Sequence, residues 1–365
     1  MRILQLTTHM DYGGIPTYVA NLSKALAHMG HKPLVVSAGG TMLKELDKAG
    51  ISHIEISLQT KSELSPKVLL SLYNLCRIIR TFKPDIIHSH TRVTQVISHL
   101  VSKLTGVAYI TTCHGFFRPR HFRKFFPCWG RRVIAISSAI KNHLNRDFSV
   151  PAERIRVIHT GIDLKKFEKA PSAAEKQELK SRLGITGCEI VGIMARLSSV
   201  KGHEYLLRAV KILAPKRKHL KLLIIGDGPQ KRDVKNEIQR LQLDNTVVLM
   251  ESTAFTSVPL SIMDVFVLPT VQEGLGLSLI EAMAAGIPTV ASKVGGVLEV
   301  IDDGKTGMLV PAKDPGALAE AIEFLLDNKA RADAMADEAK KAVFEKFNLY
   351  QMAEKILKVY KEICV

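Results

Sequence analysis

A Gly-rich segment at 268–296 holds the residues whose types and spacing are best suited to chemistry. Two carboxylates, Glu273 and Glu281, lie on either side of its glycines. Glycines let successive backbone N–H groups converge on an oxygen-rich ligand, and the N-terminus of a following helix adds positive potential. The amides expected to bind such a ligand belong to Gly274, Leu275, Gly276 and Leu277. A carboxylate beside this turn can accept paired hydrogen bonds from vicinal hydroxyls of a sugar or ribose. The alternative is a turn that only packs a strand against a helix.

Two cations in the second half of the chain suit an anionic ligand. Arg196 and Lys201 follow a predicted strand at 189–195. A guanidinium fork and an ammonium point charge together match a diphosphate, whose negative charge grows as its bond to a sugar breaks. Gly13 and Gly14, after the first predicted strand, would bring a second stretch of backbone close to the same phosphates. For the two cations, the alternative is a surface role in stabilising a loop.

These residues need parallel strands to position them. Short β-branched apolar runs alternate with amphipathic stretches along almost the whole chain, which is typical of βαβ units and of sheets buried on both faces. The first half has predicted strands near 2–7, 33–38, 53–57, 85–90, 109–113, 132–137 and 155–159. The second half has them near 189–195, 220–226, 246–250, 265–270, 288–292 and 307–310. The sequence therefore predicts an α/β fold with two Rossmann-like, doubly wound parallel-sheet domains.

The domain boundaries follow from composition. We expect one domain at 1–163 and a second at 187–345, joined by a polar and charged linker at 164–186. Residues 346–365 have the spacing of an amphipathic helix, which we expect to pack back on the first domain. Ligands of open parallel sheets bind at the carboxyl ends of the strands. The site is therefore expected in a cleft between the two domains.

The composition excludes several classes of protein. With 365 residues, 46% of them hydrophobic and no Gly or Pro period, the chain is neither disordered nor fibrous. No membrane span is expected, since the best apolar stretch, 275–291, carries Glu281. The first residues indicate a strand and not a signal peptide, and the five cysteines include no C-x-x-C pair. We therefore expect a cytoplasmic protein without a disulfide framework or a zinc site.

The positive charge is concentrated in the first half of the chain. The net charge is +16, and residues 1–165 hold 23 Lys and Arg against 9 Asp and Glu, whereas the remainder holds 28 against 26. The segment 113–132 is the most basic, with six cations, six Phe or Trp and no acidic residue. Such a segment can press its rings into the interfacial zone of a bilayer while its cations meet anionic headgroups.

This basic aromatic segment predicts a membrane-facing surface. The residues expected on it are Phe116, Phe117, Arg118, Arg120, Arg123 and Lys124. The partner would be the inner face of an anionic membrane, bound peripherally. The alternative is that the Phe rings fold inward while the arginines are solvated. A nucleic-acid partner is not expected, because no helix-turn-helix, zinc-finger, RRM or KH signature is present.

Taken together, these motifs resemble the glycosyltransferases of the GT-B fold, in particular the bacterial-type, retaining family 4 (glycosyl transferases group 1). The hallmark of that family is a pair of glutamates separated by seven residues around a Gly-rich turn, here Glu273 and Glu281. The resemblance covers nearly the full chain. The other matching stretches are DYGGIPTYVANLSKALAHMGH at 11–31, HTGID at 159–163, GIMARLSSVKGHEYLLRAV at 192–210, LLIIGDGP at 222–229 and GKTGMLV at 304–310.

The resemblance implies a hexosyltransferase-type enzyme that moves a sugar from a nucleotide-diphosphate sugar to an acceptor hydroxyl, with retention of anomeric configuration. The second domain would bind the donor and the first the acceptor, a sugar- or lipid-linked precursor of the cell envelope such as lipopolysaccharide. Glu281 would hold the ribose, and Glu273 with the turn amides would hold the sugar. Arg196 and Lys201 would hold the diphosphate.

Two further residues gain a role from the resemblance. His114, in TTCHGFF, lies in a context where family members place a histidine near the transferred sugar, although a lone histidine more often only packs or caps. Ser137 matches a position near the reaction centre, although a serine at a strand end usually caps the next helix. The catalytic candidates are thus His114, Glu273, Arg196 and Lys201. No Asp-x-Asp pair is present to hold a divalent ion, so we expect no metal and no cofactor.

Two other functions remain open. A nucleotide-sugar 2-epimerase of the same fold would need no acceptor, and a non-catalytic nucleotide-sugar-binding protein would neither transfer nor hydrolyse the donor. A dehydrogenase is less favoured, because the turn after the first strand lacks Gly-x-Gly-x-x-Gly.

Overall fold

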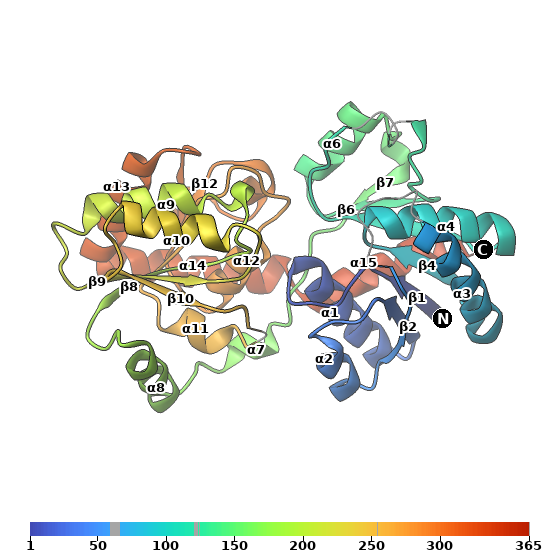
Figure 1. Cartoon of the computed structure of the whole chain (residues 1–365), viewed down its shortest axis with the longest axis horizontal. Coiled ribbons are helices and arrows are strands. Elements are labelled where there is room, and N and C mark those ends of the chain that lie inside the picture. Colours follow the sequence, from blue (N-terminus) through green and yellow to red (C-terminus); the bar gives the residue numbers. More distant parts are fainter. Residues whose placement is uncertain (59–65, 120–122, 124, 254, 365) are drawn as a thin grey trace. The chain divides into compact units, whose positions relative to one another are not determined.

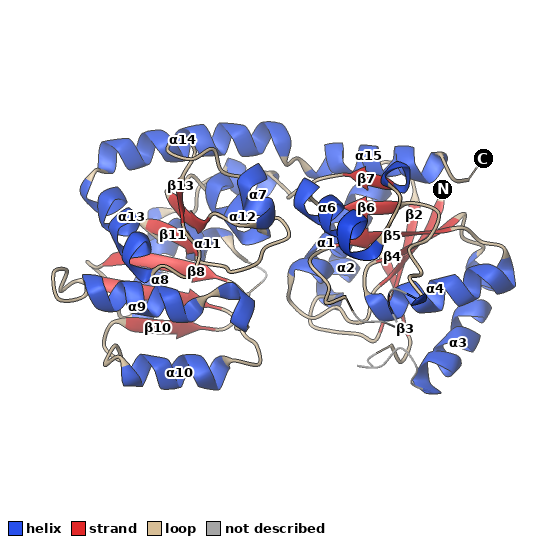
Figure 2. Cartoon of the chain, turned by 90° about the horizontal axis from the view of Figure 1, so that it is seen from above, coloured by secondary structure: helices blue, strands red, loops and turns tan. Residues whose placement is uncertain are grey.

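The chain forms two compact α/β units. The computed structural model describes all residues except 59–65, 120–122, 124, 254 and 365. The first unit comprises Met1–Gly161 and Leu349–Val365, and the second comprises Ile162–Asn348. Each is a parallel β-sheet with helices on both faces (Figures 1 and 2). The prediction of two Rossmann-like, parallel-sheet domains is confirmed.

The first sheet has strand order β3-β2-β1-β4-β5-β6-β7, with all neighbours parallel. Its strands are β1 (Arg2–Leu6), β2 (Lys32–Ser37), β3 (Ser52–Glu55), β4 (Ile86–Ser89), β5 (Tyr109–Cys113), β6 (Val133–Ala135) and β7 (Ile155–Val157). The helices of this unit are α1 (Gly14–His28), α2 (Leu43–Lys48), α3 (Pro66–Phe82), α4 (Arg92–Thr105), α6 (Ser138–Phe148), η1 (Ala152–Arg154) and α15 (Leu349–Lys361). Because helices cover both faces, β4 and β5 are buried along their whole length without alternation, polar residues included.

The second sheet has strand order β10-β9-β8-β11-β12-β13, again all parallel. Its strands are β8 (Glu189–Met194), β9 (Leu220–Ile225), β10 (Val247–Met250), β11 (Val265–Leu268), β12 (Thr289–Ser292) and β13 (Met308–Val310). The helices are α7 (Lys165–Glu168), α8 (Ala173–Leu183), η2 (Ser199–Lys201), α9 (His203–Leu213), α10 (Lys231–Arg240), α11 (Ser257–Ser261), α12 (Leu277–Ala284), η3 (Gly295–Glu299), α13 (Pro315–Asp327) and α14 (Lys329–Lys346).

Helix α15 supplies part of the core of the first unit. Its residues Met352, Ile356 and Tyr360 are buried in one cluster with Ile3 of β1 and Leu22 of α1. Figure 1 shows α15 next to α1, although more than 300 residues of chain separate them. The last helix of the described chain therefore closes the sheet built by the first half.

Residues 164–186, which we expected to be a linker, belong to the second unit. They form α7 and α8 and bury Phe167, Leu179 and Ile185. A capping box starts α8: Ser172 Oγ accepts from the Glu175 amide at 3.2 Å, and the Glu175 carboxylate accepts from the Ser172 amide at 2.8 Å. The polar composition here belongs to a largely exposed helix, α8, and its cap.

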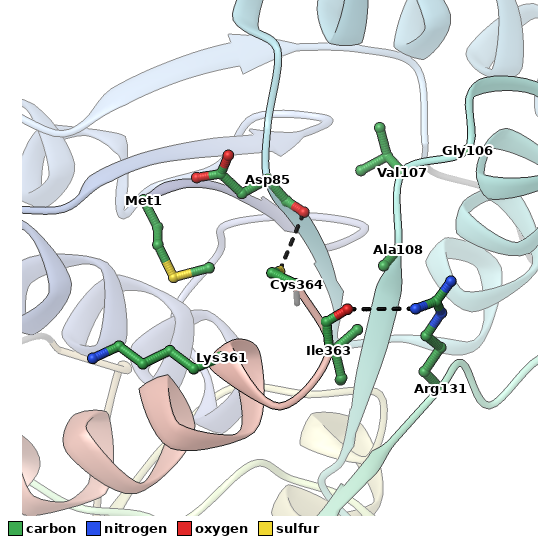
Figure 3. Close-up of a pocket in the computed structure, with 9 residues that line it drawn as sticks. All are labelled: Met1, Asp85, Gly106, Val107, Ala108, Arg131, Lys361, Ile363 and Cys364. Carbon is green, nitrogen blue, oxygen red and sulfur yellow. Dashed lines mark hydrogen bonds between the residues drawn. The ribbon is translucent and has the colours of Figure 1, made fainter.

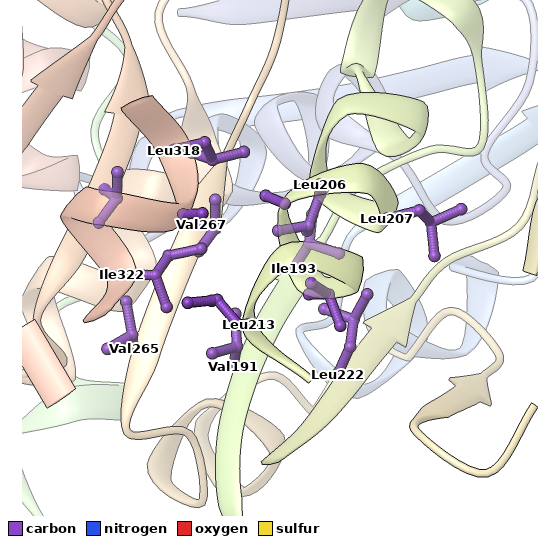
Figure 4. Packing of buried hydrophobic residues seen from close by; sticks show 14 of the residues in the cluster. Val191, Ile193, Leu206, Leu207, Leu213, Leu222, Val265, Val267, Leu318 and Ile322 are labelled. Carbon is purple, nitrogen blue, oxygen red and sulfur yellow. The ribbon is translucent and has the colours of Figure 1, made fainter. Parts of the chain in front are cut away.

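One face of the second sheet packs against α9, α10 and α13. Val191 and Ile193 of β8 meet Leu206 of α9 and Ile322 of α13 in this core (Figure 4). Between them Gly192 faces the opposite side of the sheet, where an added Cβ would lie 2.1 Å from Met263 Sδ. Tight packing on both faces fixes the position of β8.

Each sheet reverses its strand order at one point. In the first sheet β1 lies between β2 and β4, and in the second β8 lies between β9 and β11. The connections that leave neighbouring strands there run in opposite directions, which opens a crevice at the carboxyl ends of the strands. The segments after β1, β8 and β11 carry the sequence motifs.

The packing of α15 predicts a large effect of a single truncation. We expect Ile356→Ala to lower the free energy of unfolding by about 3 kcal/mol, because a fully buried side chain leaves a cavity. Equilibrium unfolding in urea measures it. The matched control is Ile212→Ala, since that isoleucine of α9 is 47% exposed. Equal losses in the two variants would contradict a structural role for α15.

Candidate functional site

In the second unit, the connections after β8 and β11 touch at the backbone. The Val271 amide donates to the Val200 carbonyl at 2.8 Å, and Thr270 Oγ1 donates to the same oxygen at 2.6 Å. Gly202 has φ +69°, and a Cβ there would lie 1.9 Å from the Pro269 carbonyl oxygen. Only glycine permits this approach, so Gly202 locks the two connections together.

An ion pair joins the side chains of the same connections. Lys201 Nζ donates to Glu273 Oε2 at 2.5 Å, and the two side chains are 23% and 11% exposed. An ammonium has three hydrogens, so two remain for a ligand. Arg196, in the connection after β8, is exposed. The structure thus brings Lys201 and Glu273 into contact and places Arg196 on the same connection.

The Gly-rich turn is held against η3. The Gly296 amide donates to the Glu273 carbonyl at 3.0 Å, and a Cβ on Gly296 would lie 2.0 Å from the Gly274 carbonyl oxygen. Gly276 takes φ +99° and starts α12. The first amides of α12, from Leu277 onward, have no acceptor within the helix and are available to an anion or hydroxyl oxygen.

Glu281 lies on α12, apart from the Lys201 and Glu273 pair. It is partly buried, accepts a hydrogen bond from Thr256 and lies near the charge of Lys166. Burial raises the pKa of Glu281 to about 7, and the other two contacts oppose that shift. The two glutamates therefore differ in environment: Glu273 is paired with a cation, and Glu281 is poised to accept or release a proton.

In the first unit, His114 lies just after β5, in contact with a second histidine. Its Nε2 is 3.2 Å from His90 Nδ1, and its ring meets Tyr18 edge-on with centroids 4.6 Å apart. Burial lowers the pKa of His114 to about 3, so the imidazole is neutral. The residue as a whole is partly buried.

Gly13 and Gly14 form the exposed start of α1. A Cβ on Gly14 would meet no atom within 4 Å, and one on Gly13 would be 3.9 Å from the nearest. Contacts within the first unit therefore do not require glycine at either position. The missing side chains leave the first amides of α1 open.

Ser137 is the N-cap of α6. Its Oγ accepts from the Ile140 amide at 3.2 Å, and the residue is fully buried. The hydroxyl therefore has the capping role usual for a serine at a strand end, and the donor contact expected of Ser137 stays a prediction.

The basic aromatic segment differs from the expectation in which rings it exposes. Phe116 and Phe117 are partly buried: Phe116 packs on His143, and Phe117 lies under the Arg123 guanidinium at 4.3 Å. Among the described rings of this segment, Phe125 is the most exposed, at 92%. Arg118 is exposed as predicted, whereas Arg120 and Lys124 lie outside the described residues. Within the described part of the chain, no helix has the length and apolarity to cross a bilayer.

A cavity of about 580 Å³ lies elsewhere in the first unit. Asp85, Ala108 and Arg131 line it, just before β4, β5 and β6, and Cys364 Sγ donates to the Asp85 carbonyl (Figure 3). This is the amino edge of the sheet, opposite the strand ends that carry Gly13 and His114. The cavity therefore does not include the predicted site residues.

Several neighbours of the site were not singled out from the sequence. They are Thr256, Lys166, Gly202 and Gly296 in the second unit and His90 and Tyr18 in the first. His88 and His90 lie two positions apart at the end of a strand, which places them on the same face. This spacing could have identified His90 from the sequence. Thr256 and Lys166 lie in segments with no motif, and only the fold brings them to Glu281.

Comparison with known proteins identifies the class. The Glycosyltransferase Family 4 model matches residues 12–166, and the Glycosyl transferases group 1 model matches residues 175–342. Alpha-maltose-1-phosphate synthase of Mycolicibacterium smegmatis is 31% identical over 76% of this chain and 79% of its own. The chain belongs to this family of glycosyltransferases.

Two other proteins are similar over most of the chain. The UDP-Gal:alpha-D-GlcNAc-diphosphoundecaprenol alpha-1,3-galactosyltransferase of Escherichia coli is 27% identical over 82% of this chain and 81% of its own. The crystal structure of Anabaena Alr3699/HepE in complex with UDP-glucose matches with a TM-score of 0.87, at 22% identity over 100% of both chains. The fold is GT-B, and the protein is a transferase.

Glu281 predicts a pH-dependent stability. The pKa of this carboxyl is raised from 4.5 to about 7 in the folded protein. Its contribution to the free energy of unfolding is therefore complete below pH 4.5 and is lost as the pH rises through 7. We expect Glu281→Gln, which stays neutral, to gain stability relative to the unsubstituted protein between these pH values. Urea midpoints across the range measure it, with the exposed Glu178→Gln as control. Parallel pH profiles for Glu281→Gln and the unsubstituted protein would contradict the burial of this carboxyl.

Proposed function

We propose that this glycosyltransferase transfers a hexose from a nucleotide-diphosphate sugar to an acceptor hydroxyl with retention of anomeric configuration. The Lys201 and Glu273 pair at the strand reversal of the second sheet carries the proposal. The anomeric C–O bond of the donor breaks, and the acceptor oxygen bonds to the same face of that carbon. The acceptor proton passes to the leaving diphosphate.

The second unit supplies the donor site in this proposal. Lys201 and Arg196 bind the diphosphate and offset the charge that develops on it, which makes a metal ion unnecessary. Glu273 orients the Lys201 ammonium and accepts sugar hydroxyls with its remaining lone pairs. The amides of Gly274, Leu275, Gly276 and Leu277 assist, and Glu281 accepts hydrogen bonds from the ribose diol.

The first unit supplies His114 and the amides after Gly13 in this proposal. A neutral imidazole suits contact with a sugar hydroxyl, since it adds no charge beside a developing cationic carbon. The acceptor is a sugar- or lipid-linked precursor of the cell envelope. The E. coli relative supports this class, because the acceptor in its name is a diphosphoundecaprenol.

If Lys201 and Glu273 form the donor site, removing either charge should weaken binding of the nucleotide sugar and slow turnover. UDP-glucose, which the Anabaena protein holds, is the first probe, followed by other UDP, GDP, ADP and CMP sugars. We expect one of them to raise the melting temperature. Lys201→Ala and Glu273→Ala should each lower turnover at least about tenfold, since each removes a charged hydrogen bond. Turnover is measured as nucleotide released.

Three controls sharpen that experiment. Lys211→Ala removes an exposed cation of α9 and should leave the rate unchanged. Excess EDTA should also leave it unchanged. Donor incubated alone should yield no epimerised nucleotide sugar, and NMR of the product gives the anomeric configuration. Near-normal activity in both Lys201→Ala and Glu273→Ala would refute the donor site.

Peripheral docking on the cytoplasmic face of an anionic membrane is the second part of the proposal. It rests on the 92% exposed Phe125, the exposed Arg118 and the concentration of positive charge in the first half of the chain. A ring that enters the interfacial zone and cations that meet headgroups act together.

Vesicle co-sedimentation tests the docking surface. We expect binding to phosphatidylethanolamine vesicles that contain phosphatidylglycerol, weakened by salt and by Phe125→Ser. The matched control is Phe255→Ser, which removes a ring of the second unit that is 69% exposed. Binding that is equal on neutral and anionic vesicles would exclude docking by charge.

A further inference from the structure

A chain of buried polar side chains leads from α15 to His114. Tyr360 Oη lies 2.6 Å from His88 Nδ1 and 3.3 Å from Gln5 Nε2. Gln5 Oε1 lies 2.7 Å from His90 Nε2, and His90 Nδ1 lies 3.2 Å from His114 Nε2. All but His114 are fully or almost fully buried. Four elements thus contribute to one network: β1, the end of β4, the end of β5 and α15.

The orientation of the Gln5 amide sets where the hydrogens of this network lie. The Gln5 amide nitrogen donates to Tyr360, so its oxygen accepts, and the donor to it is His90 Nε2–H. Burial holds the pKa of His90 well below its usual value, so the ring carries one hydrogen only. His90 Nδ1 is therefore a lone pair, and the contact with His114 requires a hydrogen on His114 Nε2.

The rest of the network agrees with this placement. Tyr360 Oη accepts from Gln5, so its own hydrogen goes to His88 Nδ1. His88 then donates from Nε2 to Thr112 Oγ1, which lies at 2.6 Å. Each hydrogen is used once and no two hydrogens face each other. Tyr18 packs against the rings of both His90 and His114, which limits their rotation.

We propose that His90, oriented by Gln5, is a positioning residue that holds His114 as its Nε2–H tautomer and leaves His114 Nδ1 as a hydrogen-bond acceptor for a sugar hydroxyl. The role of His114 in sugar contact rests on the proposed function; its tautomer does not. The consequence is selectivity, because an acceptor nitrogen takes a hydroxyl hydrogen but repels an acceptor-only oxygen. A sugar that lacks the matching hydroxyl loses this bond.

Nitrogen NMR of the full chain labelled with ¹⁵N-histidine tests the tautomer without any ligand. We expect His114 to show a protonated Nε2 and an unprotonated Nδ1, assigned by comparison with His114→Gln. In His90→Leu, which has no acceptor, the two tautomers should mix. In His90→Asn, whose side-chain oxygen replaces the Nδ1 lone pair, the Nε2–H form should persist. An Nδ1–H form in the unsubstituted protein, or an unchanged pattern in folded His90→Leu, overturns the proposal.

If His90→Leu does not fold, a second variant tests the same proposal. Gln5→Met removes the acceptor for His90 Nε2 and should also mix the His114 tautomers. Its matched control is Gln95→Met, another fully buried glutamine of the same unit, which should leave the His114 pattern unchanged. The same response to both glutamine variants overturns the proposal.

Turnover of the best nucleotide sugar then separates the two proposals. We expect His90→Leu to lower the rate at least about tenfold with little change in donor affinity, and His90→Asn to keep most of the original rate. The double variant of His90→Leu with His114→Gln should be little slower than His114→Gln alone. A normal rate in His114→Gln removes the sugar contact of the proposed function, whereas the tautomer result stands by itself.

Discussion

The contact between Gly202 and the Pro269 carbonyl is the constraint on which the second unit's site depends. A side chain at residue 202 would collide with that oxygen, so two connections from neighbouring strands are held at a fixed separation. That separation lets Lys201 reach Glu273 and places Arg196 and the start of α12 at the same sheet edge. This backbone contact therefore brings together residues that lie more than 70 positions apart in the sequence.

Desolvation sets the protonation states of the candidate residues. In a chain of net charge +16, the histidines at the end of the first sheet are buried and neutral, and burial makes Glu281 a weak acid. Buried, neutral imidazoles thus lie at the strand ends of the first unit, whereas the ion pair of Lys201 and Glu273 lies at those of the second.

Much of the fold was predictable, because strands buried on both faces appear in the sequence as short runs rich in β-branched residues. Such runs can be recognised without knowing which segments pair. The Lys201 and Glu273 motifs were likewise local. What failed depended on partners distant in sequence. Residues 164–186 have the composition of a linker, yet they bury Phe167 and Leu179.

The aromatic segment and the histidine network show the same limit. Composition found the rings but could not distinguish Phe117, which packs under Arg123, from the exposed Phe125. The spacing of His88 and His90 at the end of β4 was recognisable from the sequence. The hydrogen bonding of His90, however, depends on Gln5 and Tyr360, which lie 85 and 270 residues away along the chain. Such contacts become evident only when the sheet order is known.

The return of α15 to the first unit has a consequence for biosynthesis. While a ribosome makes this chain, the opening 161 residues emerge long before the helix that fills one face of their sheet. Until residues 349–361 leave the exit tunnel, Ile3 and Leu22 lack the apolar contacts that α15 supplies, and His88 lacks the hydrogen bond to Tyr360. The nascent first unit must therefore wait, incompletely packed and open to chaperones, for the whole second unit to be translated.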